Sequence, residues 1–586
     1  MEEHIYPKTI KGKTYYYLQQ TYRQKVDPHD TARGKGPGSG KSKVVTRTVY
    51  LGTAQSILER IKGGHGPVEV RERQFGFVAA IYQTARKIGL TDILRRHLPG
   101  RRFGIDRWLF FLLTIINRLE QATSKERMGS WARGTVLPDL LGFDPDRLTS
   151  QTYWYVTDDC LSERELREAR QSRVELSEAL GVGIDDRVLT AIEQELFTAI
   201  RERFDLQPQV LLYDTTNFFT YIQPPTPSEL ARTGHNKDSR HHLRQVGLAM
   251  TVEKEWGIPL FHRVYRGNSQ DVRTFAGLVD DLTQQIRSGF QRIDELVLVL
   301  DKGNNSPGNF SALKEDHLDW VGALAPSHHP DLLDLPLDRY EGRSDSLRFH
   351  RTNREVCGVP CALVMTYHED LARKQRHGLA EGLKKLQHQV RQQWDRYRKR
   401  PAHAVPAGIR TLVKKSRYGK CLTVAVRDGQ LIFTEIAEEL EKKRRRFGKN
   451  LLFSNRLDAE SEWIIRHYNR KTLIEDDFKL LKDPDLVRTR PIRHWTDTKI
   501  RAFCFCCVMA LVLIRVMMRM THQAGMQMSA AVLKQELCDL KEVIMIYDAS
   551  QAIRKVTARS TIQQRLWDLF DLGTVEQELT RHTTDG

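Results

Sequence analysis

The chain has 586 residues, with 92 Lys and Arg against 74 Asp and Glu, and a net charge of +18 at pH 7. Its 40% hydrophobic content supports packed cores, and its length corresponds to about three to five domains, which excludes a small single-domain protein. The basic balance favours a polyanionic partner, such as nucleic acid or an acidic membrane surface, over a generic basic enzyme.

The eight cysteines lack the spacing of a disulfide framework. Cys504, Cys506 and Cys507 lie in an apolar run, which is typical of reduced, buried thiols. No second Cys or His pair accompanies Cys357 and Cys361, so structural zinc is not expected. The N-terminus has no apolar signal core. The longest apolar stretch, 502–514, is shorter than the roughly 20 residues that span a bilayer. We therefore expect a soluble, intracellular chain with a buried helix there.

Residues 1–66 predict a small β-rich module, because strand formers dominate Ile10 to Gln19 and Val44 to Leu51. Gly34 to Lys43 lies between these runs and is rich in glycine and lysine. It has neither the glycine spacing of a phosphate-binding loop nor a preceding apolar strand. A solvated loop is the better interpretation.

Residues 67–205 predict a helical region. Phe75 to Leu90, Trp108 to Leu119 and Val188 to Phe204 carry apolar residues at spacings of three and four. Such a region can hold a DNA-binding helix-turn-helix. The pattern does not identify the helix that would enter a groove.

Residues 206–325 change to a pattern of strands and helices. The predicted elements are a strand, a hairpin, an amphipathic helix and two further strands, at 210–213, 245–252 with 259–265, 274–286, 296–300 and 318–324. This order predicts an α/β domain with a mixed sheet.

Residues 326–455 interrupt that pattern and predict a basic inserted domain. A long polar helix is expected from Arg373 to Arg400, followed by strands at 421–427 and 430–434. Residues 381–420 hold twelve Lys and Arg against two Asp and Glu. Aromatic residues are interleaved with these charges, which favours nucleic-acid contact over a merely solvated face. Residues 456–520 and 521–586 are expected to be helical.

Two aspartates stand at the carboxyl ends of predicted buried strands. Asp214 follows the run that begins at Val210, and Asp301 follows the run from Leu296 to Leu300. α/β sheets place ligands at this end of their strands. One such aspartate is more often a cap or turn residue. Two on separate strands favour a divalent-metal site, which requires paired carboxylates.

A third carboxylate, Glu475, lies in a predicted helix over 465–482. Tyr468, Lys471, Glu475 and Lys482 follow one another at spacings of three, four and seven. At about 100° per residue they fall near one stripe of the helix. On this stripe the cations can meet DNA phosphates while the carboxylate meets metal. The alternative is an ordinary surface helix with favourable ion pairs.

This helix resembles the tyrosine–arginine–glutamate–lysine signature of bacterial insertion-sequence DDE transposases, the insertion-sequence-four superfamily. The sequence departs from the signature at Lys471, where the family has arginine, although Arg470 is adjacent. Lysine keeps the charge but loses bidentate phosphate binding, which leaves the role of this position open. The segments around Asp214, Asp301 and Lys237 resemble further family blocks, and the motifs agree in order over nearly the whole chain.

The resemblance implies a multidomain α/β fold. An RNase H-like mixed-sheet catalytic domain would be interrupted by a β-rich insertion domain, with a helical N-terminal DNA-binding region. Asp214 would lie on the first strand of the catalytic domain, Asp301 by the fourth, and Glu475 on a late helix. The expected parts are a β-rich module, a helical DNA-binding domain, the first catalytic part, the basic insertion, the second catalytic part and a helical C-terminal region, at 1–66, 67–205, 206–325, 326–455, 456–520 and 521–586.

The resemblance also implies the chemistry. Asp214, Asp301 and Glu475 would be the catalytic residues and would bind two Mg²⁺ ions, or Mn²⁺ in their place, to cleave insertion-sequence ends and join them to target DNA. The DNA-contacting residues would be Tyr468, Lys471, Lys482, Lys237 and Arg470. The partners would be double-stranded DNA, as terminal inverted repeats and target, and a second copy of the chain in a homodimer. No membrane would be involved, and the location would be the bacterial or archaeal cytoplasm, at the nucleoid.

Two alternatives stay open. An RNase H-fold nuclease would cut without strand transfer, and only a joining assay separates it from a transposase. A catalytically inactive DNA-binding protein derived from a transposase would lack one of the carboxylates or part of the chain. All three carboxylates are present here.

Overall fold

The computed structural model separates the chain into two compact units, Met1–Arg73 with Lys541–Thr557, and Gln74–Leu540 with Ala558–Gly586. The residues that the structure describes are 2–25, 42–56, 69–102, 104–158, 186–206, 209–224, 226, 228–234, 240, 242–269, 275, 296–340, 342–344, 347–397, 404–548 and 551–584. The predicted loop at 34–43, apart from its last two residues, lies outside this description, as does Lys237. The same holds for the predicted helix at 274–286, apart from Phe275.

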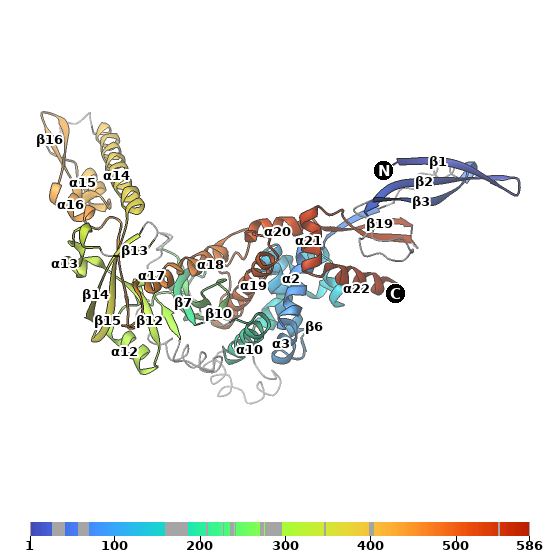
Figure 1. Cartoon of the computed structure of the whole chain (residues 1–586), viewed down its shortest axis with the longest axis horizontal. Coiled ribbons are helices and arrows are strands. Elements are labelled where there is room, and N and C mark those ends of the chain that lie inside the picture. The colour runs from blue at the N-terminus through green and yellow to red at the C-terminus, as the bar shows by residue number, and fades with distance from the viewer. Residues whose placement is uncertain are drawn as a thin grey trace. The chain divides into compact units, whose positions relative to one another are not determined.

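The first unit contains two three-stranded sheets (Figure 1). One has the order β1-β2-β3, with strands at Glu2–Ile10, Lys13–Lys25 and Ser42–Thr53. Lys11 and Gly12 both have positive φ, which is the geometry of a tight two-residue hairpin turn. The described part of residues 1–66 is thus rich in strands, as its strand-forming residues predict.

The second sheet of this unit corrects the expectation of a helical tail over 521–586. Its order is β20-β19-β4, from Gln551–Val556, Lys541–Asp548 and Glu69–Gln74. The segment from Val543 to Tyr547 is rich in β-branched and aromatic residues, which favour strands. Its partner β4 lies near the other end of the sequence, so local periodicity could not reveal the pairing. The rest of the described tail is helical as expected, in α20 (Ala530–Cys538), α21 (Thr561–Leu569) and α22 (Leu572–Thr584).

The second unit contains the predicted helical region, packed around one long helix. Its helices before the main sheet are α2, α3, α4, α5, α6, α7 and α10, at Gly76–Lys87, Leu90–His97, Arg107–Glu120, Met128–Arg133, Leu137–Leu141, Ser150–Asp158 and Asp186–Phe204. Helices α2, α4, α7 and α10 pack against α19 (Asp497–Gln523). Among the described residues α19 is the one helix long and apolar enough to cross a membrane, but 94% of its most apolar window is buried inside the protein. It is the core helix that the sequence predicts.

A mixed sheet forms the other half of this unit. Its order is β10-β9-β7-β11-β12-β18-β15-β14-β13, and the two-residue β8 (Arg232–Thr233) pairs with β9. The first five strands in this order are β10, β9, β7, β11 and β12, at Pro259–Arg266, Arg244–Glu253, Val210–Thr220, Val297–Val299 and Asp319–Leu324. Strands β7, β11 and β12 run parallel, and β7, β9 and β10 form an antiparallel meander. The mixed sheet and its hairpin are thus confirmed.

The inserted segment is less separate than the sequence predicts. Strands β18, β15, β14 and β13 continue the same sheet beyond β12, at Lys449–Ser454, Val359–His368, Leu347–Val356 and Gly342–Ser344. The expected boundary at 326 therefore coincides with no break in the sheet. The reason is that β15 is buried along almost its whole length and takes β18 as its partner, a pairing that spacing along the chain does not encode.

The remainder of the insertion has a small core of its own (Figure 1). It comprises α14, α15, β16, β17 and α16, at Glu369–Asp395, Ala407–Lys415, Leu422–Arg427, Gln430–Glu435 and Ala437–Arg444. The predicted polar helix and the two following strands are confirmed here. The apolar stripe of α14 packs in this core and its polar face is exposed.

Candidate active site

Asp214 is buried on a strand whose other residues are almost all buried. It lies in β7 opposite Met250 of β9, and the residue is 9% exposed. One carboxylate oxygen, Oδ1, accepts a hydrogen bond of 2.8 Å from the backbone N–H of Thr215. The sheet thus holds this carboxylate in a fixed position.

Asp301 stands level with Asp214 on the neighbouring parallel strand. The register pairs Val299 of β11 with Leu212 of β7, and each aspartate follows two residues later. Asp301 caps the 3₁₀ turn Lys302–Asn304 (η3) by accepting a 2.7 Å hydrogen bond from the Lys302 N–H. Parallel register therefore brings the two carboxylates level on neighbouring strands. The prediction that Asp214 ends its strand is wrong, because β7 continues to Thr220.

Glu475 belongs to α18 (Thr472–Lys482), which packs against β7 and α19. Ile474, Phe478 and Leu481 are its buried apolar residues. Glu475 lies in the first turn, where the helix dipole favours a carboxylate. Its side chain is half exposed, so it faces outward while its neighbours anchor the helix.

Lys471 joins the two more exposed carboxylates. Its Nζ lies 3.1 Å from Asp301 Oδ2 and 3.3 Å from Glu475 Oε1. The lysine side chain is 12% exposed, less than either partner. Burial acts to lower the pKa of Lys471, but the charges of Asp214 and Asp301 outweigh it and raise the pKa above its usual value. The Lys471 side chain is therefore positively charged and partly neutralises the carboxylates around it.

Tyr468 completes the group from α17 (Ser461–Asn469). The prediction of one continuous helix over 465–482 is wrong, because α17 ends at Asn469 and α18 begins at Thr472, with Arg470 and Lys471 in the turn between them. Burial raises the pKa of its phenol to about 12; Lys471 opposes this shift, and the charges of Asp301, Glu475 and Asp214 add to it. Tyr468 thus lies within electrostatic range of Lys471 and of all three carboxylates. It remains a neutral hydroxyl that can donate a hydrogen bond at physiological pH.

The donor set has the chemistry of a Mg²⁺ or Mn²⁺ site, because three carboxylates supply only oxygen ligands. In this structure the Lys471 ammonium lies between the carboxylates of Asp301 and Glu475. Within the described residues no three His, Cys, Asp or Glu side chains converge closely enough to hold a metal ion. The residues thus fit the ions by donor type, and Lys471 provides the counter-charge in this arrangement.

The remaining predicted DNA-contacting residues are placed differently. Lys482, at the far end of α18, has its Nζ 5.9 Å from the ring centre of Phe218 in β7. Arg470 is exposed between α17 and α18. Lys237 lies outside the described residues. The structure therefore gathers Tyr468 and Lys471 at the carboxylates, and places Lys482 further along β7.

Arginine and aromatic side chains lie together near the end of β7, beyond Lys482. The sequence analysis did not predict DNA contacts for these residues. The guanidinium carbons of Arg240 and Arg490 lie 4.5 and 5.9 Å from the ring centre of Phe219. That of Arg493 lies 5.9 Å from the Tyr221 ring. The Ile492 N–H donates to the Phe219 carbonyl oxygen at 3.1 Å and fixes this segment beside the end of β7. The cluster of arginines at 488–493 is the sequence feature that could have indicated this basic surface.

A buried ion pair that the sequence reasoning missed fixes α18 in place. Arg515 Nε of α19 donates to Asp477 Oδ1 at 2.5 Å. Asp477 is fully buried and Arg515 nearly so. Burial raises the pKa of Asp477 to about 7, although Arg515 acts to lower it. The signal for this pair was an arginine inside the apolar run of α19, since a buried arginine needs a carboxylate partner.

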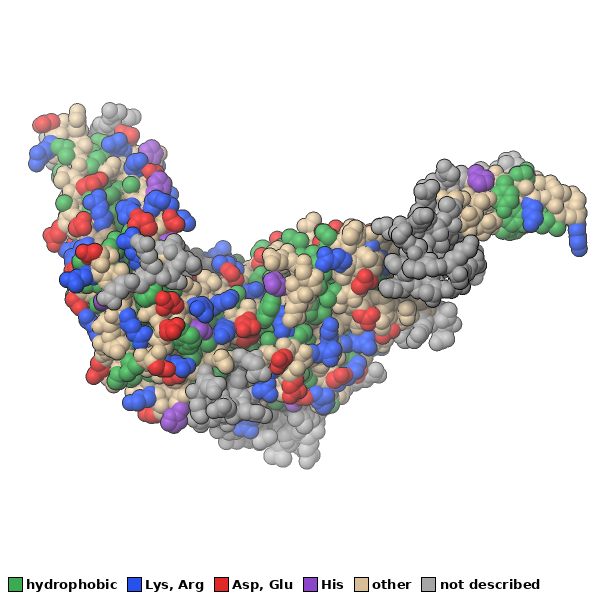
Figure 2. All heavy atoms as spheres, in the orientation of Figure 1, with side chains coloured by type: hydrophobic (Ala, Val, Ile, Leu, Met, Phe, Trp, Pro, Cys, Tyr) green, Lys and Arg blue, Asp and Glu red, His purple; other side chains and the backbone are tan. Residues whose placement is uncertain are grey.

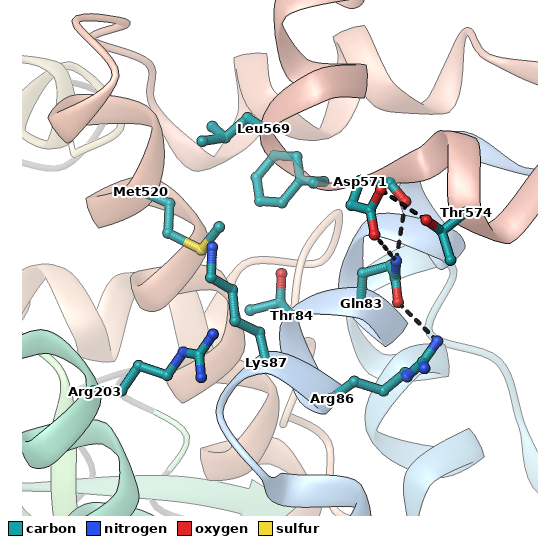
Figure 3. A pocket seen from close by; sticks show the side chains of 10 residues that line it. Gln83, Thr84, Arg86, Lys87, Arg203, Met520, Leu569, Asp571 and Thr574 are labelled. Atoms are coloured by element: carbon teal, nitrogen blue, oxygen red, sulfur yellow. Dashed lines mark hydrogen bonds between the residues drawn. The ribbon is translucent and has the colours of Figure 1, made fainter.

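The carboxylates do not lie in the cavity of about 410 Å³ in this unit. Figure 3 shows that cavity, which α2, α10, α19 and the α21–α22 turn surround. The Gln83 side-chain amide donates to the Asp571 carbonyl oxygen at 2.9 Å, and Thr574 donates to the Asp571 carboxylate at 2.8 Å. Since its polar residues largely satisfy one another, we assign no site there.

No protein-family model matches the sequence, and no curated protein matches it. The chain is similar to solved transposase structures only at low levels. A piggyBac transposase synaptic complex with hairpin DNA aligns at 11% identity and a TM-score of 0.34, over 79% of this chain and 77% of that one. A Mos1 transposase paired-end complex with the left transposon end aligns at 12% identity and a TM-score of 0.15, over 40% of this chain and 62% of that one. At such TM-scores these similarities decide neither fold nor function.

Proposed function

We propose that the chain is a DDE transposase that cuts the ends of an insertion sequence and joins them to target DNA. The observation that carries the proposal is the contact of a single ammonium, that of Lys471, with Asp301 and Glu475, together with the level position of Asp214 beside Asp301 on the neighbouring strand. Two neighbouring strands supply the aspartates, and helix α18, which follows them in the sequence, supplies Glu475. Asp214 lies on β7 and Asp301 follows β11, positions that agree with the first and fourth strands of an RNase H-like domain.

In this proposal the three carboxylates are both the catalytic residues and the metal ligands. When two Mg²⁺ ions are bound by them, the ions supply an activated water and stabilise the leaving 3′ oxygen. Asp214 is held by the Thr215 N–H and Asp301 by the Lys302 N–H, so both are pre-oriented. Glu475 enters from a helix with an exposed outer face, on the side from which DNA approaches.

The DNA backbone would follow α18 and the end of β7. Lys471 contacts two of the carboxylates, and the charges of all three act on Tyr468. Arg470 is exposed beside Lys471, and Lys482 lies at the other end of α18. We propose these four residues as phosphate contacts, and Lys237 as a fifth. Beyond Lys482 the arginines stacked on the rings of β7 extend the positive surface, which suits the phosphates of duplex DNA.

The larger assembly follows from the same proposal. The helical region before β7 and the basic insertion would hold terminal inverted repeats and target DNA, and two copies of the chain would pair the element ends. The insertion's α14 offers an exposed polar face for such contacts. The protein would act at the nucleoid in the bacterial or archaeal cytoplasm.

The test is cleavage and joining of duplex DNA that carries the ends of the element encoding the chain, with Mg²⁺ and then Mn²⁺. Glu475→Gln should lower the cleavage rate by on the order of 10³-fold, because one metal ligand loses its charge. Asp476→Asn is the matched control, since this neighbouring carboxylate is exposed and pairs with Lys479 on the outer face of α18. Cleavage without joining would favour the nuclease. If the wild type binds the ends and cuts under neither metal, the inactive DNA-binding protein replaces the proposal.

A further inference from the structure

One face of the β1-β2-β3 sheet carries a row of tyrosines, one from each strand. The register places Tyr6 opposite Tyr17, and Tyr17 opposite Tyr50. Residues directly opposite in antiparallel strands point to the same face. The ring centres lie 5.7 Å apart for Tyr6 and Tyr17, and 5.4 Å apart for Tyr17 and Tyr50. Tyr15 extends the row, with its ring 5.9 Å from that of Tyr50.

These rings do not form a core. Tyr50 is 55% exposed, and Tyr6, Tyr15 and Tyr17 are half-buried. Among the described elements, β1, β2 and β3 pack extensively only against one another. Hydrophobic side chains are visible at the surface of this sheet in Figure 2. An exposed apolar patch of this kind marks a binding surface.

Positive charge surrounds the rings. Lys8 lies directly opposite Tyr15, and Lys13 opposite Ile10, so both lysines share the tyrosine face. Both are exposed, and no ion pair joins either of them to a carboxylate in the described part of the chain. Residues 2–25 and 42–53 hold seven Lys and Arg against two Asp and Glu. The surface therefore suits a polyanion that also offers flat apolar groups.

We propose that the tyrosine face, formed by Tyr6, Tyr15, Tyr17 and Tyr50, binds single-stranded DNA. Unpaired bases stack on the rings, and Lys8 and Lys13 meet the phosphates. In duplex DNA each base face is covered by its neighbour and only the edges are accessible in the grooves, so this face requires unpaired bases. A second copy of the chain is disfavoured as the occupant, because two faces of the same positive charge would repel each other. This inference makes no use of the carboxylates and stands apart from the proposed function.

The first test measures the affinity of the full-length protein for a labelled oligothymidine by fluorescence anisotropy. The salt concentration is raised until purely electrostatic binding is weak. Tyr17→Leu combined with Tyr50→Leu should weaken binding by roughly tenfold or more, because two stacking platforms are lost. Tyr17→Trp should keep the affinity, since it keeps an aromatic ring. Tyr16→Leu is the matched control, because this adjacent tyrosine points to the opposite face of β2.

A second readout locates the contact directly and keeps the test independent of folding effects. An oligonucleotide carrying 5-bromodeoxyuridine is photo-crosslinked to the wild-type protein, and the adducts are mapped by mass spectrometry. Adducts on the four tyrosines support the proposal. Adducts confined to other parts of the chain overturn it, as does an unchanged affinity of the Tyr17→Leu and Tyr50→Leu double variant.

Two further measurements distinguish single-stranded DNA from the other possible ligands of this face, which are duplex DNA and a second copy of the chain. If a duplex of the same sequence competes as well as the single strand, binding to unpaired bases is wrong. If the double variant changes the sedimentation of the free protein from dimer to monomer, the face is an interface between copies. Oligothymidine binding is measured without divalent ions and needs no cleavage, so failure of the proposed nuclease activity and failure of this proposal are distinguishable.

Discussion

The ammonium of Lys471 lies 3.1 Å from the carboxylate of Asp301. The signature that the helix resembles has arginine at this position, and the shorter, compact charge of lysine fits among the carboxylates as a point cation. Lysine here therefore serves as a counter-ion to the acidic group, which is a different task from bidentate phosphate binding.

Without the charge of Lys471, the negative charges of the carboxylates should repel one another and lower the stability of the folded protein. In Lys471→Met we expect a lower melting temperature without divalent ions, tighter binding of Mn²⁺ and a larger stabilisation when Mn²⁺ is added, since ligand binding to the folded state raises stability. Calorimetric titration of Mn²⁺ and thermal unfolding measure both effects. Lys479→Met is the control, because this lysine is exposed and pairs with the exposed Asp476. Equal Mn²⁺ affinity in wild type and Lys471→Met would contradict the prediction.

Lys482 should act as a phosphate contact. Lys482→Gln is expected to weaken duplex DNA binding at all sequences alike and to reduce the slope of log K against log salt by about 1. Binding measured at several salt concentrations gives that slope. The Lys479→Gln variant, on the same helix but with its own carboxylate partner, should keep the wild-type slope. A changed sequence preference without a changed slope would mean that Lys482 reads bases.

The sequence predicted the elements around the carboxylates because their signals are local. The apolar run before Asp214, the run before Asp301 and the apolar residues beside Glu475 are each visible within a few residues. The stripe predicted from Tyr468 to Lys482 assumed one helix, whereas the structure has two. The pairing of Val299 with Leu212, which sets the two aspartates level, is a property of the assembled sheet. The contacts of Lys471 likewise depend on the packing of α18 against β7, which no local pattern encodes.

The Asp477–Arg515 pair should be important for stability. Arg515→Met leaves a buried carboxylate without its cation and is expected to destabilise the fold by about 3–5 kcal/mol. Urea unfolding measures this loss. The double variant Asp477→Leu with Arg515→Met should recover a large part, because no unpaired charge stays buried. If the double variant is as unstable as the single one, the loss came from packing and not from charge.

His494 should contribute a pH-dependent part of the stability. Burial, reinforced by the charges of Lys125, Arg118 and Lys499, lowers its pKa to about 3. The unfolded chain therefore binds a proton at this histidine that the folded chain excludes. Its contribution is complete above about pH 6.5 and is lost as the pH falls toward 3, by roughly 2 kcal/mol between pH 6.5 and 5.

His494→Phe should remove this part of the pH dependence while keeping the ring contacts to Tyr153 and Phe503. Urea unfolding at pH 7.5 and at pH 5 compares the two proteins, and the difference between the two pH values should shrink by about that amount in the variant. His388→Gln, an exposed position on α14, should behave as the wild type. An unchanged pH profile in His494→Phe would show that other groups account for it.

The parts that sequence analysis could not place share one cause, which is pairing over long separations. Strand β19 was expected to be helical, yet it pairs with β4 near the other end of the chain. Strands β15 and β18 were expected in a separate insertion, yet they extend the sheet that carries Asp214. Periodicity reports what a segment buries, whereas the identity of its partner depends on the whole fold.

The insertion of β18 between β12 and β15 sets the order in which the protein can mature during synthesis. Strand β12 gains its second neighbour only after residues 449–454 leave the ribosome, and α18 follows later still. A chain released earlier, by a frameshift or a broken message, holds two of the three carboxylates and lacks the helix that brings the third. On the proposed function, incomplete copies would be unable to cut the host chromosome, and the ability to cut would arise only near the end of translation.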